Sequence, residues 1–300
     1  MNRTVQIFQV DAFTERRFAG NPAGVVLHAE VLSDEEMLAI ARELNNADTA
    51  FVLPPDGPDH DLRMRFFTPR TEAGFVGHAT VAAHYVLSQH SVSPGSKRQK
   101  QKAGMVNVEV RGGGAMRRIA IRQPPPALGR ELNERERLAV LDALALSTSA
   151  LDTRCPMRIC GTGGTRLMIG VRSVDQLRGL KPDFQRLTTL SAQLGAQGHF
   201  VFTLKGAPEN CLTESRMFCP ALGIAEDPVS GNAHGILGAY LVQHGLLAAQ
   251  GDAAGFCGAQ GEFLHRPGRV EVELEFANKA LAGVWIIGAA ALVFETSLTL

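Results

Sequence analysis

The sequence predicts a mixed α+β protein that is built from two similar halves. Patterns typical of strands and of amphipathic helices alternate along the 300 residues. A set of motifs in the first half recurs in the same order in the second half. Between the halves lies Pro124-Pro125-Pro126, which can neither continue a helix nor donate to a central ladder. The chain is long enough for a sizeable hydrophobic core.

The first half is predicted to hold two strands, a helix, two more strands, an apolar helix and a hairpin. Ser33 and Glu36 form a capping box at the start of the first helix. The basic segment SVSPGSKRQKQK, residues 91–102, is predicted to be an exposed loop. In chain order the predicted elements are 4–10, 23–28, 34–45, 49–53, 62–67, 78–89, and 106–110 with 116–121.

The second half follows a linker that we place at 123–131, around the three prolines. Asn133 and Glu136 cap a helix over 134–146. Strands, helical segments and a second apolar helix come next, and C-terminal hairpins complete the pattern. In chain order these elements are 157–160, 165–171, 174–178, 183–194, 199–204, 215–219 and 233–244.

The repeat rests on four ordered matches between the halves. Arg65-Phe66-Phe67-Thr68-Pro69 recurs 151 residues later as Arg216-Met217-Phe218-Cys219-Pro220. The same offset relates the strand that starts at Thr49 to one that starts at Phe200. Gly20-Asn21 matches Gly163-Gly164, and Gly77-His78-Ala79 matches Gly231-Asn232-Ala233. These matches indicate an internal duplication, and the alternative is a chance likeness of two α/β halves.

A glycine turn begins the apolar helix of each half, as Gly77-His78-Ala79 and as Gly231-Asn232-Ala233. The first N–H groups of a helix are unpaired and bind anions, and glycine allows close backbone approach. If both turns face one cleft, they can hold a small carboxylate without a Lys or Arg. For either turn alone, an ordinary helix start is the alternative interpretation.

Three titratable residues lie beside these turns or on matching strands and are candidates for acid–base chemistry. Asp48 precedes the strand TAFVL, His78 follows Gly77, and Asp227 lies four residues before Gly231. Desolvation in a half-dry cleft raises the pKa of a carboxyl group, which suits it to proton transfer near neutral pH. The alternatives are a cap or turn role for each aspartate and a structural role for the histidine.

Composition and motif searches exclude several other functions. Lys+Arg and Asp+Glu are both 30, which argues against a nucleic-acid partner. No dinucleotide or P-loop fingerprint, nucleophile elbow or H-x-x-x-H pair occurs, so no cofactor or metal is expected. The longest apolar run, 280–294, is too short for a membrane helix, and we expect a cytoplasmic protein. Five cysteines without a C-x-x-C pair argue against a zinc site or a disulfide framework.

Four segments together resemble the phenazine-biosynthesis isomerase family, which is called PhzF-like. They are FQVDAFTERRFAGNPAGVV, LNNADTAFVL, RFFTPRTEAGFVGHATVAAHYVL and AEDPVSGNAHGILGAYL. The resemblance implies the diaminopimelate-epimerase-like fold, in which two pseudo-symmetric domains each wrap a curved mixed sheet around a central helix. The first domain would be 1–122, completed by a last strand at about 287–300, and the second would be 132–286.

The resemblance also implies a cofactor-independent proton shift on a small carboxylate metabolite, performed by a homodimer. Asp48 stands where the family usually has the acid–base glutamate, which is a departure of one methylene. His78 and Asp227 match auxiliary polar residues. The positions that match the substrate-binding turns are Gly77, Ala79, Ser230, Gly231, Asn232 and Ala233.

Related epimerases and proline racemases carry one thiol at each glycine turn, and this chain carries none there. Our leading hypothesis is therefore an isomerase in which Asp48 moves a proton between two carbons. The alternatives are a one-base epimerase or racemase of an amino or hydroxy acid, and a carboxylate-binding protein without turnover.

Overall fold

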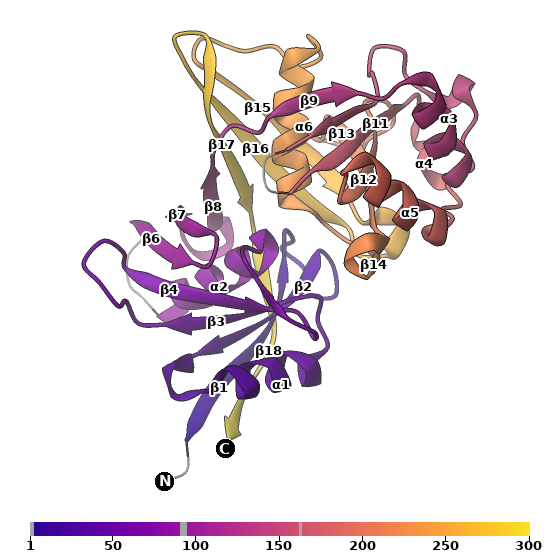
Figure 1. The fold of residues 1–300 in the computed structure, drawn as a ribbon. Helices are drawn as coiled ribbons and strands as arrows, with labels where there is room; N and C mark the ends of the chain where they lie inside the picture. The colour runs from indigo at the N-terminus through magenta and orange to yellow at the C-terminus, as the bar shows by residue number, and fades with distance from the viewer. Residues whose placement is uncertain (1–2, 91–94, 162–163) are drawn as a thin grey trace. The chain divides into compact units, whose positions relative to one another are not determined.

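The computed structural model describes residues 3–90, 95–161 and 164–300. The chain divides into two compact units, each with its own core. Unit 1 comprises the residues up to Gln123 together with Ile287–Leu300, and unit 2 comprises Pro124–Ile286. Figure 1 labels most of the helices and strands of both units.

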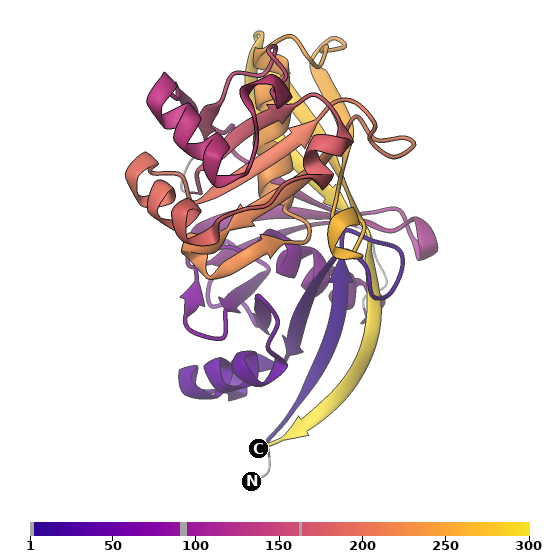
Figure 2. The ribbon, with the colours of Figure 1, turned by 90° about the vertical axis from the view of Figure 1, so that its right-hand side faces the viewer.

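The sheet of unit 1 starts from a pair formed by the first and last strands of the chain (Figure 2). Arg3 and Leu300 exchange both backbone hydrogen bonds at the end of this pair. All neighbours are antiparallel except β2–β3 and β4–β6. The short β5 (Glu72–Ala73) also pairs with β4. In spatial order the strands are β18 (Ala290–Thr299), β1 (Thr4–Ala12), β2 (Asn21–Leu27), β3 (Thr49–Leu53), β4 (Leu62–Phe67), β6 (Gly95–Gln101), β7 (Gly104–Arg111) and β8 (Arg118–Gln123).

Helices cover both faces of this sheet, and the alternation of side chains along the strands explains how. On β1, Phe8 and Val10 pack with α2 (Gly77–His90), whereas Val5 and Ile7 pack with α1 (Asp34–Leu44). The contact face of α2 is rich in alanine, so the helix lies close to the strands. Because both faces are buried, β2 and β3 consist almost wholly of buried residues.

Unit 2 repeats the pairing pattern of unit 1, with parallel pairs at β11–β12 and β13–β15 and antiparallel pairs at β9–β10, β10–β11, β12–β13 and β15–β16. The short β14 (Ile224–Asp227) pairs with β13 as β5 pairs with β4. In spatial order the strands are β9 (Leu128–Glu131), β10 (Arg158–Cys160), β11 (Arg166–Val171), β12 (Gly198–Thr203), β13 (Thr213–Cys219), β15 (Ala253–Gln260) and β16 (Gly268–Ala277), and β17 (Ala280–Gly288) follows in the chain.

The helices of unit 2 also lie on opposite faces of its sheet. Met168 of β11 packs with α6 (Gly231–Gln243), and its neighbours Leu167 and Ile169 pack with the other helices. Those are α3 (Glu134–Ala143), α4 (Val174–Arg178) and α5 (Phe184–Leu194). Short 3₁₀ helices complete the two units at Ala29–Val31, Gly114–Met116, Thr148–Ala150, Pro220–Leu222 and Glu262–Leu264.

Side-chain contacts repeat between the units as well. Arg65 stacks on Phe67, 5.1 Å from the ring centre, and pairs with Glu72 of β5. Arg216 stacks on Phe218 at 5.0 Å and pairs with Glu226 of β14. The duplicated motif therefore forms the same ion pair between corresponding strands of each unit, β4 with β5 and β13 with β14.

One part of the predicted repeat is wrong by one residue. Thr49 of β3 pairs with Phe67, and His199 of β12 pairs with Phe218, so Thr49 corresponds to His199 and not to Phe200. The loop that joins β3 to β4 is one residue shorter than the loop that joins β12 to β13. Asp48 consequently corresponds to Gly198.

The predicted basic loop at 91–102 is also wrong over its described part, because β6 occupies 95–101. This strand is almost entirely polar, so it lacks an apolar alternation, but it pairs with both β4 and β7. Arg98 and Lys100 form ion pairs with Asp61 and Asp56. Residues 91–94 of the predicted loop lie outside the described residues, and so does Gly163 of the predicted repeat. The predicted linker contains β9, which pairs with β10.

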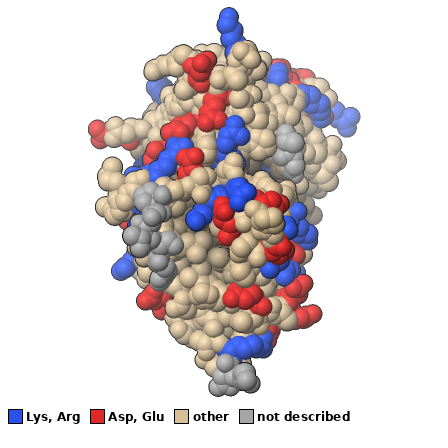
Figure 3. Space-filling model, turned by 90° about the vertical axis from the view of Figure 1, so that its left-hand side faces the viewer, with Lys and Arg blue, Asp and Glu red and all other residues tan. Residues whose placement is uncertain are grey.

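Charges of both signs are interspersed on the face shown in Figure 3, and neither sign forms a continuous patch there. In the part of the chain that the structure describes, no helix is long and apolar enough to cross a membrane.

Candidate active site

Unit 1 brings two of the predicted catalytic side chains together. Asp48 directly precedes β3, and its carbonyl oxygen accepts the N–H of Gly24 from β2 at 3.3 Å. His78 is the second residue of α2. The imidazole Nε2 lies 3.8 Å from the carboxylate Oδ2 of Asp48, and each side chain is 11% exposed. A strand start and a helix start thus hold a carboxylate and an imidazole side by side.

The imidazole of this pair is neutral at neutral pH. Burial lowers the pKa of His78 to about 4. Among the described residues no hydrogen-bond partner reaches its Nε2, since 3.8 Å to Asp48 exceeds hydrogen-bond length. A neutral ring nitrogen and a carboxylate oxygen at this separation leave room for a third group to bridge them.

The first turn of α2 offers backbone donors. Thr80 donates from both its N–H and its hydroxyl to the carbonyl of Val76, which closes the first helical turn. In the described chain, no acceptor reaches the N–H groups of the three residues before Thr80. A Cβ built on Gly77 would meet no atom within 4 Å, so this backbone is open. Ala79 is fully buried, and its side chain belongs to the core of unit 1.

The corresponding turn in unit 2 is held from both sides. The hydroxyl of Ser230 accepts the N–H of Ala233 at 3.4 Å and caps α6. The amide of Gln260 accepts the N–H of Ser230 at 3.0 Å and donates to the carbonyl of Asp227 at 2.6 Å. Gln260 is 1% exposed and lies on β15, about thirty residues further along the chain. No signal in the sequence marked it.

Asn232 follows Gly231 at the start of this helix, in the place that His78 takes in unit 1. Its Oδ1 is buried, and no donor among the described residues reaches it. Ala233 is fully buried, so its side chain belongs to the core of unit 2. The N–H groups of Gly231 and Asn232 have no acceptor in the described residues.

The predicted site residues therefore form two local groups. Asp48, His78 and the Gly77 turn belong to unit 1. Asp227, Ser230 and the Gly231 turn belong to unit 2. That both groups serve one cleft stays a prediction.

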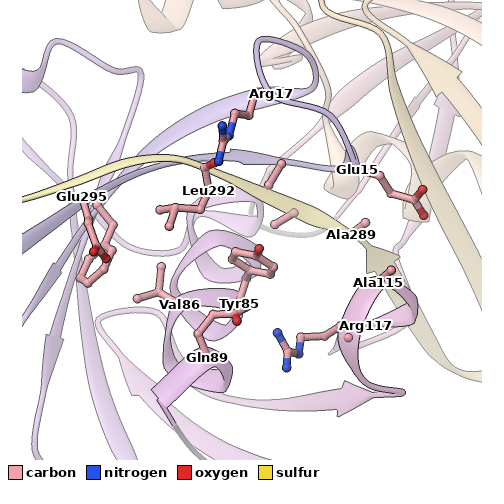
Figure 4. A pocket seen from close by; sticks show the side chains of 14 residues that line it. Glu15, Arg17, Tyr85, Val86, Gln89, Ala115, Arg117, Ala289, Leu292 and Glu295 are labelled. Atoms are coloured by element: carbon pink, nitrogen blue, oxygen red, sulfur yellow. The ribbon is translucent and has the colours of Figure 1, made fainter.

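A cavity of about 620 Å³ lies elsewhere in unit 1. It is lined by β1, β18 and the second half of α2, where Arg117 extends toward Gln89 (Figure 4). Tyr85 and Gln89 are about 12–18 Å along the helix axis from Gly77 at 1.5 Å per residue. The cavity is therefore separate from the Asp48–His78 pair. In the described residues no group of three or more His, Cys, Asp or Glu side chains is arranged to hold a metal ion.

A family model described as phenazine biosynthesis-like protein (PhzC-PhzF) matches residues 10–296. An uncharacterized isomerase of Clostridium acetobutylicum is 38% identical over the whole length of both chains. The uncharacterized isomerase YddE of Salmonella typhimurium is 40% identical over 97% of each. A trans-2,3-dihydro-3-hydroxyanthranilate isomerase of Pseudomonas chlororaphis is 31% identical over 79% of this chain and 80% of its own.

Solved structures show the same fold. A PhzF-family protein of Bacillus anthracis has a TM-score of 0.88 and 29% identity, over 99% of each chain. A hydroxyproline epimerase of Agrobacterium vitis has a TM-score of 0.61 at 14% identity, over 99% of this chain and 93% of that one. The second likeness concerns the fold alone. The predicted diaminopimelate-epimerase-like fold is confirmed.

Proposed function

The chain belongs to the phenazine biosynthesis-like PhzC-PhzF family and is an isomerase, and we propose that it shifts a proton between two carbons of a small carboxylate-bearing metabolite. The reaction would need no cofactor, because a carboxylate can both take and return the proton. The observation that carries this proposal is the approach of Asp48 and His78 in unit 1.

In the proposed reaction the carboxylate of Asp48 removes a proton from one carbon and becomes a carboxylic acid. The acid then delivers the same proton to a second carbon, so the enzyme ends in its starting state. The neutral imidazole of His78, 3.8 Å from Asp48, would orient the substrate or relay the proton.

Backbone N–H groups would hold the substrate carboxylate and stabilise the enolate-like charge that develops when the proton leaves. The free donors at the start of α2 and of α6 suit this role. We propose that both turns serve one substrate, with the buried amide of Asn232 and the carboxyl group of Asp227 orienting it. Ser230 would act by fixing the turn, since its hydroxyl caps α6.

Solvent exchange tests the role of Asp48 directly. Wild type and Asp48→Asn are incubated in deuterium oxide with a panel of cyclic and amino carboxylates, and deuterium incorporation is followed by NMR. Loss of a positioned acid–base group costs roughly 100- to 10,000-fold, so exchange by the variant should fall by that range. Asp61→Asn, which removes an exposed partner of Arg98, is the matched control and should exchange as wild type does.

Equal exchange by wild type and Asp48→Asn would remove Asp48 from the mechanism. Optical rotation of the same mixtures separates the proposed isomerisation from a one-base epimerisation, which would invert a centre without moving a double bond. The relatives are named isomerases, which argues against a carboxylate-binding protein without turnover.

A further inference from the structure

Two cysteine side chains of unit 2 lie in direct contact, away from the glycine turns. Cys211 precedes β13 by two residues, and Cys257 lies within β15. Their Sγ atoms are 2.7 Å apart, about 0.7 Å longer than a disulfide bond of ~2.05 Å. Both residues are partly exposed. A small oxidant can therefore reach the pair.

The backbone fixes this approach. Leu212 donates its N–H to the carbonyl of Cys257 at 2.8 Å. The next residues, Thr213 and Gly258, are partners in the parallel pairing of β13 with β15. Cys211 stands one residue before Leu212, so a strand spacing of about 4.8 Å and a rise of about 3.3 Å per residue put its Cα roughly 6 Å from that of Cys257, within the roughly 4.4–6.8 Å that disulfides accept. Neither strand has to move for the two sulfur atoms to bond.

The surroundings activate one thiol of the pair. The S–H···S hydrogen bond and the guanidinium of Arg269 lower the pKa of Cys211 to about 7, although burial and Glu262 oppose this. The same hydrogen bond, burial and the neighbouring Glu271 raise the pKa of Cys257. The thiolate is the nucleophilic form of cysteine, so a lowered thiol pKa favours reaction of this pair with an oxidant.

The other three cysteines provide an internal contrast. Cys155, Cys160 and Cys219 are buried, and burial raises their pKa values to about 12, 11 and 12. Buried neutral thiols react slowly with oxidants. Oxidation of the folded protein should therefore select one pair among five cysteines.

We propose that Cys211 and Cys257 are an oxidant-responsive disulfide site that cross-links β13 to β15. With a peroxide as the oxidant, the thiolate of Cys211 attacks one peroxide oxygen, the O–O bond breaks and a sulfenic acid forms. The sulfur of Cys257 then attacks the sulfenic sulfur, the S–S bond forms and the S–O bond breaks. Two thiols and one hydrogen peroxide give one disulfide and two waters.

The cross-link would lie next to the turn that begins α6. Gln260, which holds Asp227 and Ser230, is three residues beyond Cys257 on the same strand. The disulfide would close a loop that contains this turn, since the two cysteines are 46 residues apart. Oxidation would thus link β15, the strand that carries Gln260, covalently to β13.

The test uses the native full-length protein with a modest excess of hydrogen peroxide. We expect a mass decrease of about 2 Da with two of the five thiols lost, as the chemistry of one disulfide requires. Peptide mapping without reductant should show the segments around Cys211 and Cys257 linked, and a reductant should release them. The oxidised protein should also melt at a higher temperature than the reduced protein.

Three serine variants sharpen the test. Cys211→Ser and Cys257→Ser should each form no cross-link under the same treatment, whereas Cys219→Ser should still form it. Peptide mapping of the wild type needs no variant, so a folding defect in one of them leaves the question answerable. Native oxidation that leaves Cys211 and Cys257 unlinked, or that links other cysteines equally, would overturn the proposal.

Discussion

The two glycine turns have the same architecture but differ in chemical content. In both units a short strand, β5 or β14, leads into a turn and then into an apolar helix. In unit 1 the turn carries His78, which faces Asp48 at 3.8 Å. In unit 2 the corresponding residues are Asn232 and Gly198, so no titratable pair occurs at this place. The duplication preserves the backbone donors in both units and the acid–base pair in one.

Packing explains why unit 2 has no carboxylate at this position. A Cβ on Gly198 would lie 2.6 Å from the methyl group of Met217, 2.8 Å from the sulfur of Cys219 and 3.2 Å from Arg166. A side chain there would require Met217 and Cys219 to shift. The comparison teaches that backbone anion binding survives sequence change because it needs only a helix start, whereas a catalytic carboxylate also needs vacant volume.

The largest expected effect comes from making the first turn resemble the second. His78→Asn gives unit 1 the Gly-Asn-Ala sequence of unit 2 and removes the ring nitrogen beside Asp48. We expect turnover to fall on the order of 100-fold, about 3 kcal/mol, with a smaller change in KM. Steady-state kinetics measures this split. The reciprocal Asn232→His should not restore turnover to that variant, and restoration would mean that the two turns are interchangeable.

The packing difference between Gly198 and Gly77 predicts a difference in stability. Gly198→Ala overpacks the site between Met217 and Cys219 and should cost about 1–3 kcal/mol of unfolding free energy. Gly77→Ala meets open space and should change that free energy by about 0.5 kcal/mol or less. Urea denaturation of both variants measures the two costs. Equal costs would contradict the packing argument.

Protonation distinguishes the turns as well, because His78 titrates and Asn232 does not. The pKa of His78 is about 4 in the folded chain against 6.5 for an ordinary histidine. The unfolded chain therefore binds the proton first, and the stability present above pH 6.5 is lost as the pH falls toward 4. His78→Asn lacks this titrating group. Its loss of unfolding free energy between pH 7 and pH 5 should therefore be smaller than that of wild type by about 1–2 kcal/mol.

His78→Asn should keep part of this pH dependence even so, since burial also lowers the pKa values of His84, His199 and His234 to about 4. Unfolding free energies of wild type and His78→Asn at the two pH values give the comparison. Parallel curves would show that His78 is protonated alike in the folded and unfolded chains.

The smallest effect concerns the cap that unit 2 uses at its turn. Ser230→Ala removes the acceptor for the N–H of Ala233 and should cost about 1 kcal/mol of stability. Ser33→Ala removes a corresponding cap from α1 and should cost a similar amount. Only Ser230→Ala should raise KM, because only its turn is proposed to hold the substrate. A matching rise in Ser33→Ala would reduce the effect to general destabilisation.

Sequence reasoning identified what local patterns encode. The capping boxes at Ser33 and Asn133 and the two apolar helices are present, within two residues for α2 and α6. It missed β6, whose strand character comes from pairing with two neighbours and not from an apolar alternation.

Local sequence patterns do not predict contacts between distant segments. Gln260 reaches the α6 turn from β15, and Cys257 reaches Cys211 across a strand pairing. The sequence marked Asp48 and His78 only as separate candidates, because their 3.8 Å approach depends on how the start of α2 packs beside β3.

The pairing of β1 with β18 has a consequence for how the chain matures on the ribosome. One of the two neighbours of β1, the strand β18, is encoded some 280 residues later, after the whole of unit 2. At roughly 5–20 residues per second, a nascent β1 waits tens of seconds for it with one edge unpaired. Unit 2 can fold during synthesis, whereas the scaffold that aligns Asp48 is completed only after β18 has been made.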